Sequence, residues 1–341
     1  MPSAALPPDL HQIARDAARN GRRPAPPRTA TILGLGHYLP SEVIPNGPIA
    51  EAIGVDDEWI VRRTGIHARR RAAPSERTSD LAVFAARRAM QDAGIDALDV
   101  DHVIVATMSA DEITPNCAPL VAHALGAERA AAFDIGAACT GFLAGLSQAA
   151  ALVEIGRAER VLLIGAESLT RLTDFEDKKT GPLFGDGAGA AVIGPSEDGT
   201  GVGPIDLLAD GGLADTIVAT YADPWIRMDG ISTFKIAVKR LSESTVFAVA
   251  AAGLELDDID LFVYHQANSR IIRAVGERLD LDPAKVADYI GQLGNTSAAS
   301  VPLTLSLSRE DGRLRTGMKV LLGAIGAGFT WGTGVMEWTA S

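Results

Sequence analysis

The chain has few cysteines, no excess of basic charge and no long hydrophobic run. Two cysteines among 341 residues are too few for a disulfide scaffold, so a reducing, cytoplasmic setting is expected. The formal net charge of −12 argues against nucleic acid as a partner, because phosphate binding needs a basic surface. No apolar run reaches the roughly 20 residues of a membrane span, so no membrane partner is expected either.

What the chain does have is length and apolar content. With 47% hydrophobic residues and 35 glycines, it can bury a large core, either as two domains or as one duplicated unit. Residues 1–28 are rich in Pro, Ala and Arg and lack an apolar signal core, so they are predicted to be a flexible leader. The remainder is predicted to divide into halves at 29–198 and 199–341.

An internal repeat supports this division. Residues 93–105 and 252–264 both run from Ala-Gly through acidic residues into an apolar strand, 159 residues apart. Val161 and Val320, which begin two further apolar strands, are separated by the same 159 residues. Two matches at one offset predict a duplicated α/β half with largely parallel strands. The expected buried strands are Val103–Thr107, Val161–Gly165, Leu261–Tyr264 and Val320–Ile325.

Cys139 lies in "DIGAACTGF", where a turn leads into a stretch that is apolar around most of a helix. A buried helix would favour the thiolate at its amino end, whereas apolar surroundings oppose it. This placement suits a nucleophile, although a packed and inert thiol is the alternative. Cys117, in "TPNCAPL", has no comparable setting and is assigned the inert role.

Two further polar residues stand at equivalent edges of the repeat. His265 in "YHQAN" ends an apolar strand, and Asn295 in "LGNTSAAS" precedes the helix that matches the one after Cys139. Sites in α/β sheets lie beyond the carboxyl ends of strands, so these three residues are predicted to converge near a pseudo-twofold axis. Singly, His265 could bridge a loop and Asn295 could cap a helix. No histidine or cysteine spacing suggests a metal.

Six segments together make the sequence recognisable. In chain order they are "WIVRRTGI", "DIGAACTGF", "FGDGAGA", "YHQAN", "LGNTSAAS" and "GAGFTWG". This series closely resembles the β-ketoacyl-acyl carrier protein synthase III family, condensing enzymes of the thiolase superfamily, from about Thr31 to Trp338. The resemblance implies the thiolase fold, a duplicated five-layer αβαβα arrangement with pseudo-twofold symmetry, usually in a homodimer.

The resemblance also implies an acyltransferase reaction of fatty acid biosynthesis, a decarboxylative Claisen condensation. Cys139 would take an acyl group from acyl-CoA, and malonyl-acyl carrier protein would then be extended to β-ketoacyl-acyl carrier protein. His265 and Asn295 would donate hydrogen bonds to the malonyl thioester oxygen as CO₂ leaves. The backbone N–H groups of Cys139 and Ala327 would form the oxyanion hole. No cofactor is implied, because coenzyme A enters only as a thioester substrate.

Other matching positions are implied to bind substrates and partners. The coenzyme A positions are Trp59, Arg63, Lys178 and Asn268. Lys178 replaces an arginine that is common in the family and stacks less well on a base, and Trp59 could instead anchor a surface helix. The acyl-pocket positions are Thr114, which would reach the partner subunit's pocket and admit chains longer than acetyl, and Phe184. A basic face comprising Lys235, Lys239, Arg240, Arg270, Arg273 and Arg278, chiefly Lys235, Arg270 and Arg278, would dock the acidic carrier protein unless it is merely solvated.

Alternative functions are weighed against the same motifs. A degradative thiolase needs a second cysteine, which "GAGFTWG" lacks, and a hydroxymethylglutaryl-CoA-type synthase needs an acid, yet no Glu stands in a matching motif. Chalcone-type synthases differ in their surrounding motifs. A non-extending acyltransferase would not need Asn295, and the complete Cys-His-Asn set disfavours a relic binding protein. The unusual segment "ATYADPWIRMDG" keeps a specialised starter-unit ketosynthase of secondary (polyketide) metabolism open.

The segment "FGDGAGA" is predicted to be a turn into the strand "AAVIG", not a phosphate loop.

Overall fold

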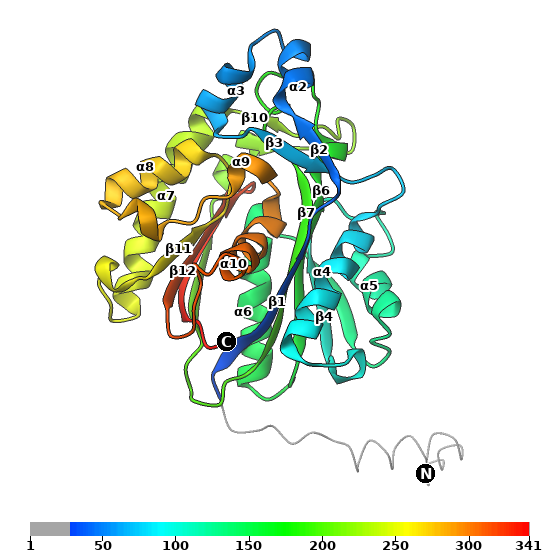
Figure 1. Cartoon of the computed structure of the whole chain (residues 1–341), viewed down its shortest axis with the longest axis vertical. Coiled ribbons are helices and arrows are strands. Elements are labelled where there is room, and N and C mark those ends of the chain that lie inside the picture. The colour runs from blue at the N-terminus through cyan, green and yellow to red at the C-terminus, as the bar shows by residue number, and fades with distance from the viewer. Residues whose placement is uncertain (1–27, 341) are drawn as a thin grey trace, which may run out of the picture.

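Two mixed β-sheets are stacked with helices between them and on both outer faces in the computed structural model, which describes residues 28–340 (Figure 1). Apart from Arg28, the predicted leader lies outside the described residues. Arg28 itself is anchored, because its guanidinium donates hydrogen bonds to the Val153 carbonyl (3.2 Å) and the Glu159 carboxylate (2.8 Å).

The first sheet has the order β1-β7-β6-β4-β5. Its strands are β1 (Ala30–Tyr38), β4 (His102–Ala106), β5 (Ala131–Ile135), β6 (Val161–Ser168) and β7 (Asp186–Pro195). The second sheet has the order β11-β12-β13-β8. Its strands are β8 (Val202–Ala209), β11 (Leu261–Tyr264), β12 (Lys319–Gly326) and β13 (Thr330–Glu337).

The sheets are less parallel than the sequence analysis predicts. Only β4 with β5, β4 with β6 and β11 with β12 pair in parallel. The pairs β1–β7, β6–β7, β12–β13 and β13–β8 are antiparallel. The expectation fails because β7 and β13 are joined to their neighbours by returning loops without a crossover helix, a connection that leaves strands antiparallel.

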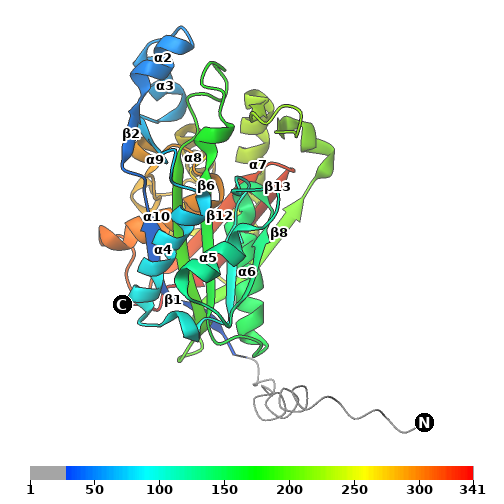
Figure 2. The same ribbon diagram turned by 90° about the vertical axis from the view of Figure 1, so that its right-hand side faces the viewer.

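The helices supply the three α layers (Figure 2). Helices α6 (Gly141–Glu154) and α10 (Ser300–Glu310) lie between the sheets. Helices α4 (Thr78–Ala93) and α5 (Cys117–Leu125) cover the outer face of the first sheet, and α7 (Gly230–Ala251) and α8 (Ser269–Leu279) that of the second. The central apolar core runs from Phe142 and Leu146 of α6 to Val301 and Leu305 of α10. The predicted five-layer αβαβα arrangement is confirmed.

The 159-residue repeat is visible at the level of single residues. β4 begins at His102 and β11 at Leu261. The one-turn helices η2 (Ala138–Thr140) and η7 (Ser297–Ala299) precede the central helices α6 and α10 at the same offset. Their first residues, Ala138 and Ser297, share a φ of 45°, a value that non-glycine residues rarely adopt. The duplication therefore extends to the unusual turns that precede the central helices.

Small elements complete the chain above the carboxyl ends of the strands (Figure 1). They are β2 (Glu42–Pro45), α2 (Asn46–Ala52), α3 (Asp57–Thr64), β3 (Ala68–Arg71), β9 (Ile217–Val218), β10 (Arg227–Met228) and α9 (Ile290–Leu293). Short 3₁₀ turns lie at Ala97–Asp99, Leu169–Leu172, Gly211–Thr216, Leu256–Asp258 and Pro283–Lys285. No helix among residues 28–340 is both long and apolar enough to cross a bilayer.

Most of the segment "FGDGAGA" is strand and not the predicted turn, because β7 already begins at Asp186. Its glycines do allow close backbone approach, as expected. A Cβ at Gly189 would lie 2.6 Å from the backbone nitrogen of Leu303 in α10. The glycine-rich start of β7 thus lets a central helix lie directly on the sheet.

Candidate active site

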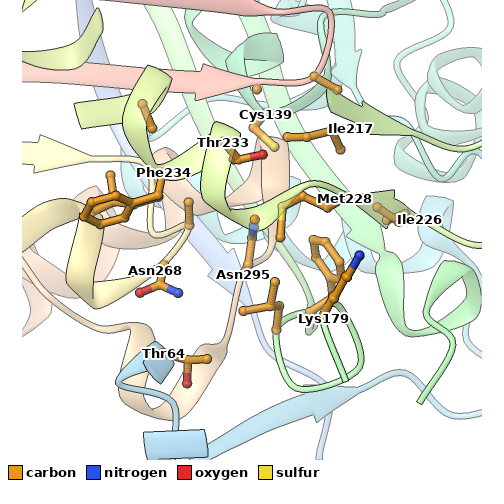
Figure 3. A pocket seen from close by; sticks show the side chains of 18 of the residues that line it. Thr64, Cys139, Lys179, Ile217, Ile226, Met228, Thr233, Phe234, Asn268 and Asn295 are labelled. Atoms are coloured by element: carbon orange, nitrogen blue, oxygen red, sulfur yellow. The ribbon is translucent and has the colours of Figure 1, made fainter. Parts of the chain in front are cut away.

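A cavity of about 860 Å³ opens between the halves, at the carboxyl ends of the parallel strands (Figure 3). It brings together most of the residues singled out in the sequence. Its lining includes Cys139, His265, Asn295, Ala327, Trp59, Arg63, Lys178, Asn268, Phe184, Lys235 and Arg270. Thr114 and Arg278 do not line it.

Cys139 lies on η2, between the end of β5 and the start of α6. The residue is half-buried because it opens into the cavity, while the protein atoms around the sulfur raise the pKa of its thiol to about 11. The backbone N–H groups of Cys139 and Ala327 act in the opposite direction and lower this pKa. Burial therefore outweighs the stabilisation expected from the helix end, and both predicted oxyanion donors lie close to the sulfur.

Strand β12 ends directly against Cys139. A Cβ on Gly326 would lie 2.7 Å from the Cys139 backbone nitrogen, so only glycine fits there without displacing Cys139. This contact brings Ala327, the next residue of the second half, beside a thiol that belongs to the first half.

His265 follows β11, and its backbone N–H donates to the Gly323 carbonyl at 2.7 Å. The side chain is buried, and burial lowers the pKa of the imidazole to about 3. His265 is therefore neutral near pH 7, with one ring N–H available as a donor. Its Nδ1 has no hydrogen-bond partner among the described residues.

The carboxamide oxygen of Asn295 is already engaged in a hydrogen bond within the protein. Its Oδ1 accepts from the Ser297 N–H at 2.9 Å, which leaves the NH₂ group to act as a donor in the cavity. Its backbone is held by the Leu183 carbonyl at 2.8 Å and the Gly185 N–H at 3.0 Å. A fixed donor of this kind needs no reorganisation when charge develops on a substrate oxygen.

The cavity is apolar on one side of Cys139. Met108, Leu169, Leu183, Ile217, Ile226 and Met228 line it together with Phe184. Most of these residues belong to one hydrophobic cluster with Ile66 and Ile290. This wall suits an acyl chain, and it includes the predicted acyl-pocket residue Phe184.

The mouth of the cavity carries an aromatic ring and cations. The Arg63 guanidinium carbon lies 4.5 Å and the Lys178 ammonium 5.0 Å from the centre of the Trp59 ring. Asn268 caps α8 by accepting from the Arg270 N–H (2.9 Å) and donates to the Arg63 carbonyl (3.1 Å). Asn268 therefore fixes the backbone at Arg63, a positioning task that the sequence analysis does not foresee.

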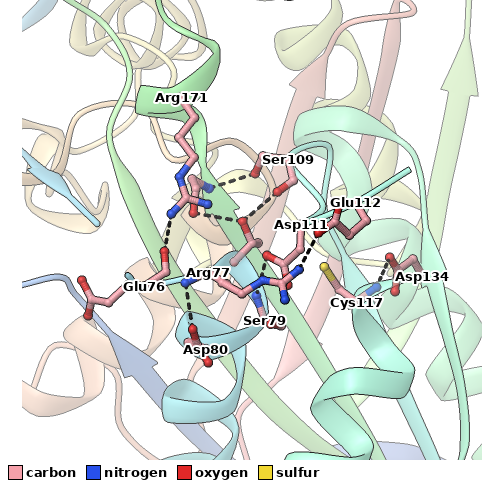
Figure 4. A network of polar contacts seen from close by, with 12 residues as sticks. Glu76, Arg77, Ser79, Asp80, Ser109, Asp111, Glu112, Cys117, Asp134 and Arg171 are labelled. Atoms are coloured by element: carbon pink, nitrogen blue, oxygen red, sulfur yellow. Dashed lines mark hydrogen bonds and ion pairs between the residues drawn. The ribbon is translucent and has the colours of Figure 1, made fainter. Parts of the chain in front are cut away.

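Thr114 lies on an exposed loop away from the cavity. The loop is braced against α4, because Arg77 forms ion pairs with Asp111 (3.4 Å) and Glu112 (3.0 Å) (Figure 4). Its neighbour Ile113 has 82% of its surface exposed. Within a single chain, then, Thr114 faces outward on a buttressed loop.

The basic residues fall into two groups. Lys235 and Arg270 are exposed at the cavity mouth, whereas Lys239 and Arg240 each form an ion pair with Glu243. Arg273 and Arg278 are exposed on α8. The mouth therefore carries exposed positive charge at Lys235 and Arg270.

Sequence reasoning missed the carboxylate of Glu167. The analysis expects no acid beside the site, but Glu167 is fully buried and close enough to Cys139 to raise the pKa of the thiol. The available signal was an acid inside the apolar run "VLLIGAES", since such a strand buries charge only at a cost. Ser297, whose hydroxyl lowers the pKa of the thiol, was missed as well.

Comparisons with known proteins agree on one family. Residues 133–211 match the family model for 3-oxoacyl-(acyl-carrier-protein) synthase III, and residues 249–338 match the model of its C-terminal part. The chain is 42% identical to the β-ketoacyl-(acyl-carrier-protein) synthase III of Geobacillus kaustophilus over 309 residues, which cover 91% of this chain and 99% of the relative.

Solved structures give the same result. The 3-oxoacyl-(acyl-carrier-protein) synthase III of Aquifex aeolicus aligns with a TM-score of 0.88 and 38% identity, covering 91% of this chain and all of that one. The priming β-ketosynthase of the R1128 polyketide pathway aligns with a TM-score of 0.89 and 36% identity, covering 94% of this chain and 99% of its own.

Proposed function

The chain belongs to the β-ketoacyl-acyl carrier protein synthase III family of condensing enzymes, and from this premise we propose that Cys139, His265 and Asn295 carry its reaction. The observation that supports these roles most directly is their convergence. A thiol, a neutral imidazole and a carboxamide NH₂ line one cavity, although they come from separate segments of the two halves.

In the first half-reaction Cys139 attacks the carbonyl carbon of an acyl-CoA. The negative charge that develops on the carbonyl oxygen is stabilised by the backbone N–H groups of Cys139 and Ala327, which lie close to the sulfur. Coenzyme A leaves as the thiol, and the acyl chain lies along the apolar wall beside Phe184.

In the second half-reaction malonyl-acyl carrier protein enters. Loss of CO₂ places negative charge on its thioester oxygen, where the N–H of His265 and the NH₂ of Asn295 donate hydrogen bonds. Donors fixed before the charge develops are each worth about 3 kcal/mol. The resulting enolate attacks the acyl-cysteine and yields β-ketoacyl-acyl carrier protein. A pure acyl transfer would leave the Asn295 donor without a task.

The acyl donor can be identified by mass spectrometry. We expect the Cys139 peptide to gain an acyl group after incubation with a mixture of acetyl-, branched and medium-chain acyl-CoA. Chains longer than acetyl should be accepted, because the cavity measures about 860 Å³ and has an apolar wall, and because Thr114 is smaller than an aromatic residue at that position. Modification by the acetyl group alone would contradict the selectivity, and an unmodified Cys139 would contradict the function.

Coenzyme A is proposed to bind with its adenine at the mouth. Trp59 and Arg63 offer an indole face and a guanidinium plane for stacking, and Lys178 with Lys179 places positive charge near the phosphates. Asn268 contributes by holding the Arg63 carbonyl. No resident cofactor takes part in these steps.

The acidic carrier protein is proposed to dock on Lys235, Arg270 and Arg278. Raising the salt concentration from about 0.05 M to 0.5 M should weaken its binding about tenfold, because exposed charges are screened. Lys235→Ala should weaken binding and flatten this salt dependence. Lys239→Ala is the matched control, because Lys239 already forms an ion pair with Glu243. The dissociation constant of malonyl-carrier protein, measured by titration at several ionic strengths, tests this proposal. A dissociation constant that does not change with ionic strength would exclude this docking.

A homodimer is proposed from the edge of the first sheet. Among residues 28–340, β5 pairs only with β4, so its other edge is available to a strand of a second copy. Thr114, on the loop between β4 and α5, is proposed to reach the partner subunit's acyl pocket, which accounts for its position outside the cavity of its own chain.

The pathway is a second proposal. The similarity to a priming β-ketosynthase of polyketide biosynthesis favours starter-unit condensation as the alternative to primary fatty acid synthesis. Both reactions would take place in the cytoplasm, where both thiols of the chain stay reduced. Comparing turnover with carrier proteins of the two pathways distinguishes them.

A further inference from the structure

Glu167 is a buried acid without a basic partner. It lies in β6, no part of its surface is exposed, and no Lys or Arg among residues 28–340 forms an ion pair with it. Its carboxylate accepts hydrogen bonds from the Ser109 hydroxyl (2.5 Å), the Met108 N–H (3.2 Å) and the Thr107 hydroxyl (3.2 Å). A buried carboxylate is costly to the fold even when it is hydrogen-bonded, so its position calls for a reason.

Ser297 connects Glu167 with Cys139. Ser297 begins η7, which packs against η2, the turn that carries Cys139, and against β6, the strand that carries Glu167. The N–H of the next residue, Ala298, donates to the Glu167 carboxylate at 3.4 Å. The Ser297 hydroxyl is buried, has no hydrogen-bond partner among the described residues, and lowers the pKa of both Cys139 and Glu167. The backbone of Ser297 is fixed by the Asn295 carboxamide (2.9 Å) and has a φ of 45°. The hydroxyl is thus buried without a partner between the turn that carries the thiol and the strand that carries the carboxylate, and it is free to rotate toward either.

We propose that Glu167 accepts the proton of the Cys139 thiol and later returns it, with the Ser297 hydroxyl as the relay. This inference rests on the proposed role of Cys139 as the nucleophile. It makes Ser297 a participant that touches the reacting sulfur, and Glu167 a group that acts through it.

The proton balance closes over the two half-reactions. As the thiol S–H proton passes to the Ser297 oxygen, the Ser297 O–H proton passes to Glu167, and the sulfur forms its bond to the acyl carbon. The bond from that carbon to the coenzyme A sulfur breaks, and the leaving thiolate takes a proton from solvent. After decarboxylation and carbon–carbon bond formation, Cys139 leaves as thiolate, and the proton held on Glu167 returns to it through Ser297.

His265 is poorly suited to this task. Burial lowers the pKa of its imidazole to about 3, so it holds an extra proton weakly, and its N–H is needed as a donor. Burial raises the pKa of Glu167 to about 7, which is near the optimum for a group that exchanges protons at neutral pH. Around Glu167 stand the hydroxyls of Thr107 and Ser109 and the N–H groups of Met108 and Ala298. Cys139 is the ionisable group on which the charge of Glu167 acts, because it raises the pKa of that thiol.

The pH dependence of Cys139 alkylation by iodoacetamide tests the relay. In the unaltered full-length protein the rate, read from the mass of the Cys139 peptide, should rise as Glu167 ionises near pH 7 and again as the thiol itself ionises. Glu167→Gln should remove the first rise and slow alkylation and acyl loading at pH 7.5 about 100-fold. Ser297→Ala should do the same with the carboxylate intact. Alanine is accommodated at that φ, as Ala138 shows in the other half.

Ser109→Ala is the matched control. It removes the shortest hydrogen bond to Glu167 but leaves the relay, and because this donor favours the charged carboxylate, its loss should shift the first rise to higher pH without abolishing it. If Glu167 only stabilises the packing of the strands, Glu167→Gln, Ser297→Ala and Ser109→Ala will all lower the melting temperature. The two rises of the alkylation rate with pH will then remain at their original pH values in all three variants, which would overturn the relay. Acyl loading of the unaltered protein at Cys139 separates the two proposals. Its absence contradicts the proposed function, whereas loading together with an unchanged profile in Glu167→Gln contradicts only the relay.

Discussion

Cys139→Ala should abolish acyl loading and reduce condensation to background, because no other group in the cavity can form the thioester. Incubation with radiolabelled acyl-CoA followed by gel analysis measures loading directly. The effect should be at least about 10⁴-fold, comparable to the loss of the nucleophile in other covalent enzymes.

Cys117→Ala is the control for this variant. Cys117 is buried outside the cavity, and burial raises the pKa of its thiol to about 12. Its loss should leave loading intact and affect only stability. Label that persists in Cys139→Ala and disappears in Cys117→Ala would reverse the assignment of the two thiols.

The second large effect separates the half-reactions. Asn295→Ala should still load acyl groups but slow carbon–carbon bond formation by about 10²- to 10³-fold, the usual consequence of losing one fixed donor to a developing oxyanion. Release of labelled CO₂ from malonyl-acyl carrier protein, measured beside acyl loading, shows which step has failed.

Asn295→Asp refines this test. The Asn295 carboxamide oxygen accepts the Ser297 N–H, and alanine leaves that buried donor unpaired, which itself destabilises the site. Aspartate retains the acceptor and removes the NH₂ group. Equal loss of condensation in both variants, with loading retained, assigns the effect to the missing donor. Full condensation by Asn295→Asp would contradict the role proposed for Asn295.

The sequence was sufficient to predict the internal repeat and the convergence of Cys139, His265 and Asn295. Both depend on local patterns at a constant offset, and a duplicated unit converts an offset in sequence into symmetry in space. The same offset also relates Ala138 to Ser297, whose shared φ of 45° no residue preference would indicate.

Strand direction and the buried acid were harder to predict. β7 and β13 are apolar runs like their neighbours, and burial on both faces does not reveal whether a strand runs parallel or antiparallel. Glu167 was not predicted as a site residue because its environment is formed by Ser109, Ser297 and Cys139, which come from three other segments of the chain. The mouth of the cavity falls between these cases, because Trp59 and Arg63 are close in sequence whereas Asn268 and Lys178 reach them only through the fold.

The two N–H groups beside the sulfur belong to different copies of the repeat, one at Cys139 and the other at Ala327. Neither copy alone contains the pair. An ancestral single unit would have had to meet a second molecule to create such a site, and its activity would have fallen on dilution. Joining the copies in one polypeptide makes their encounter intramolecular, so this pair of N–H groups stays assembled however dilute the protein is.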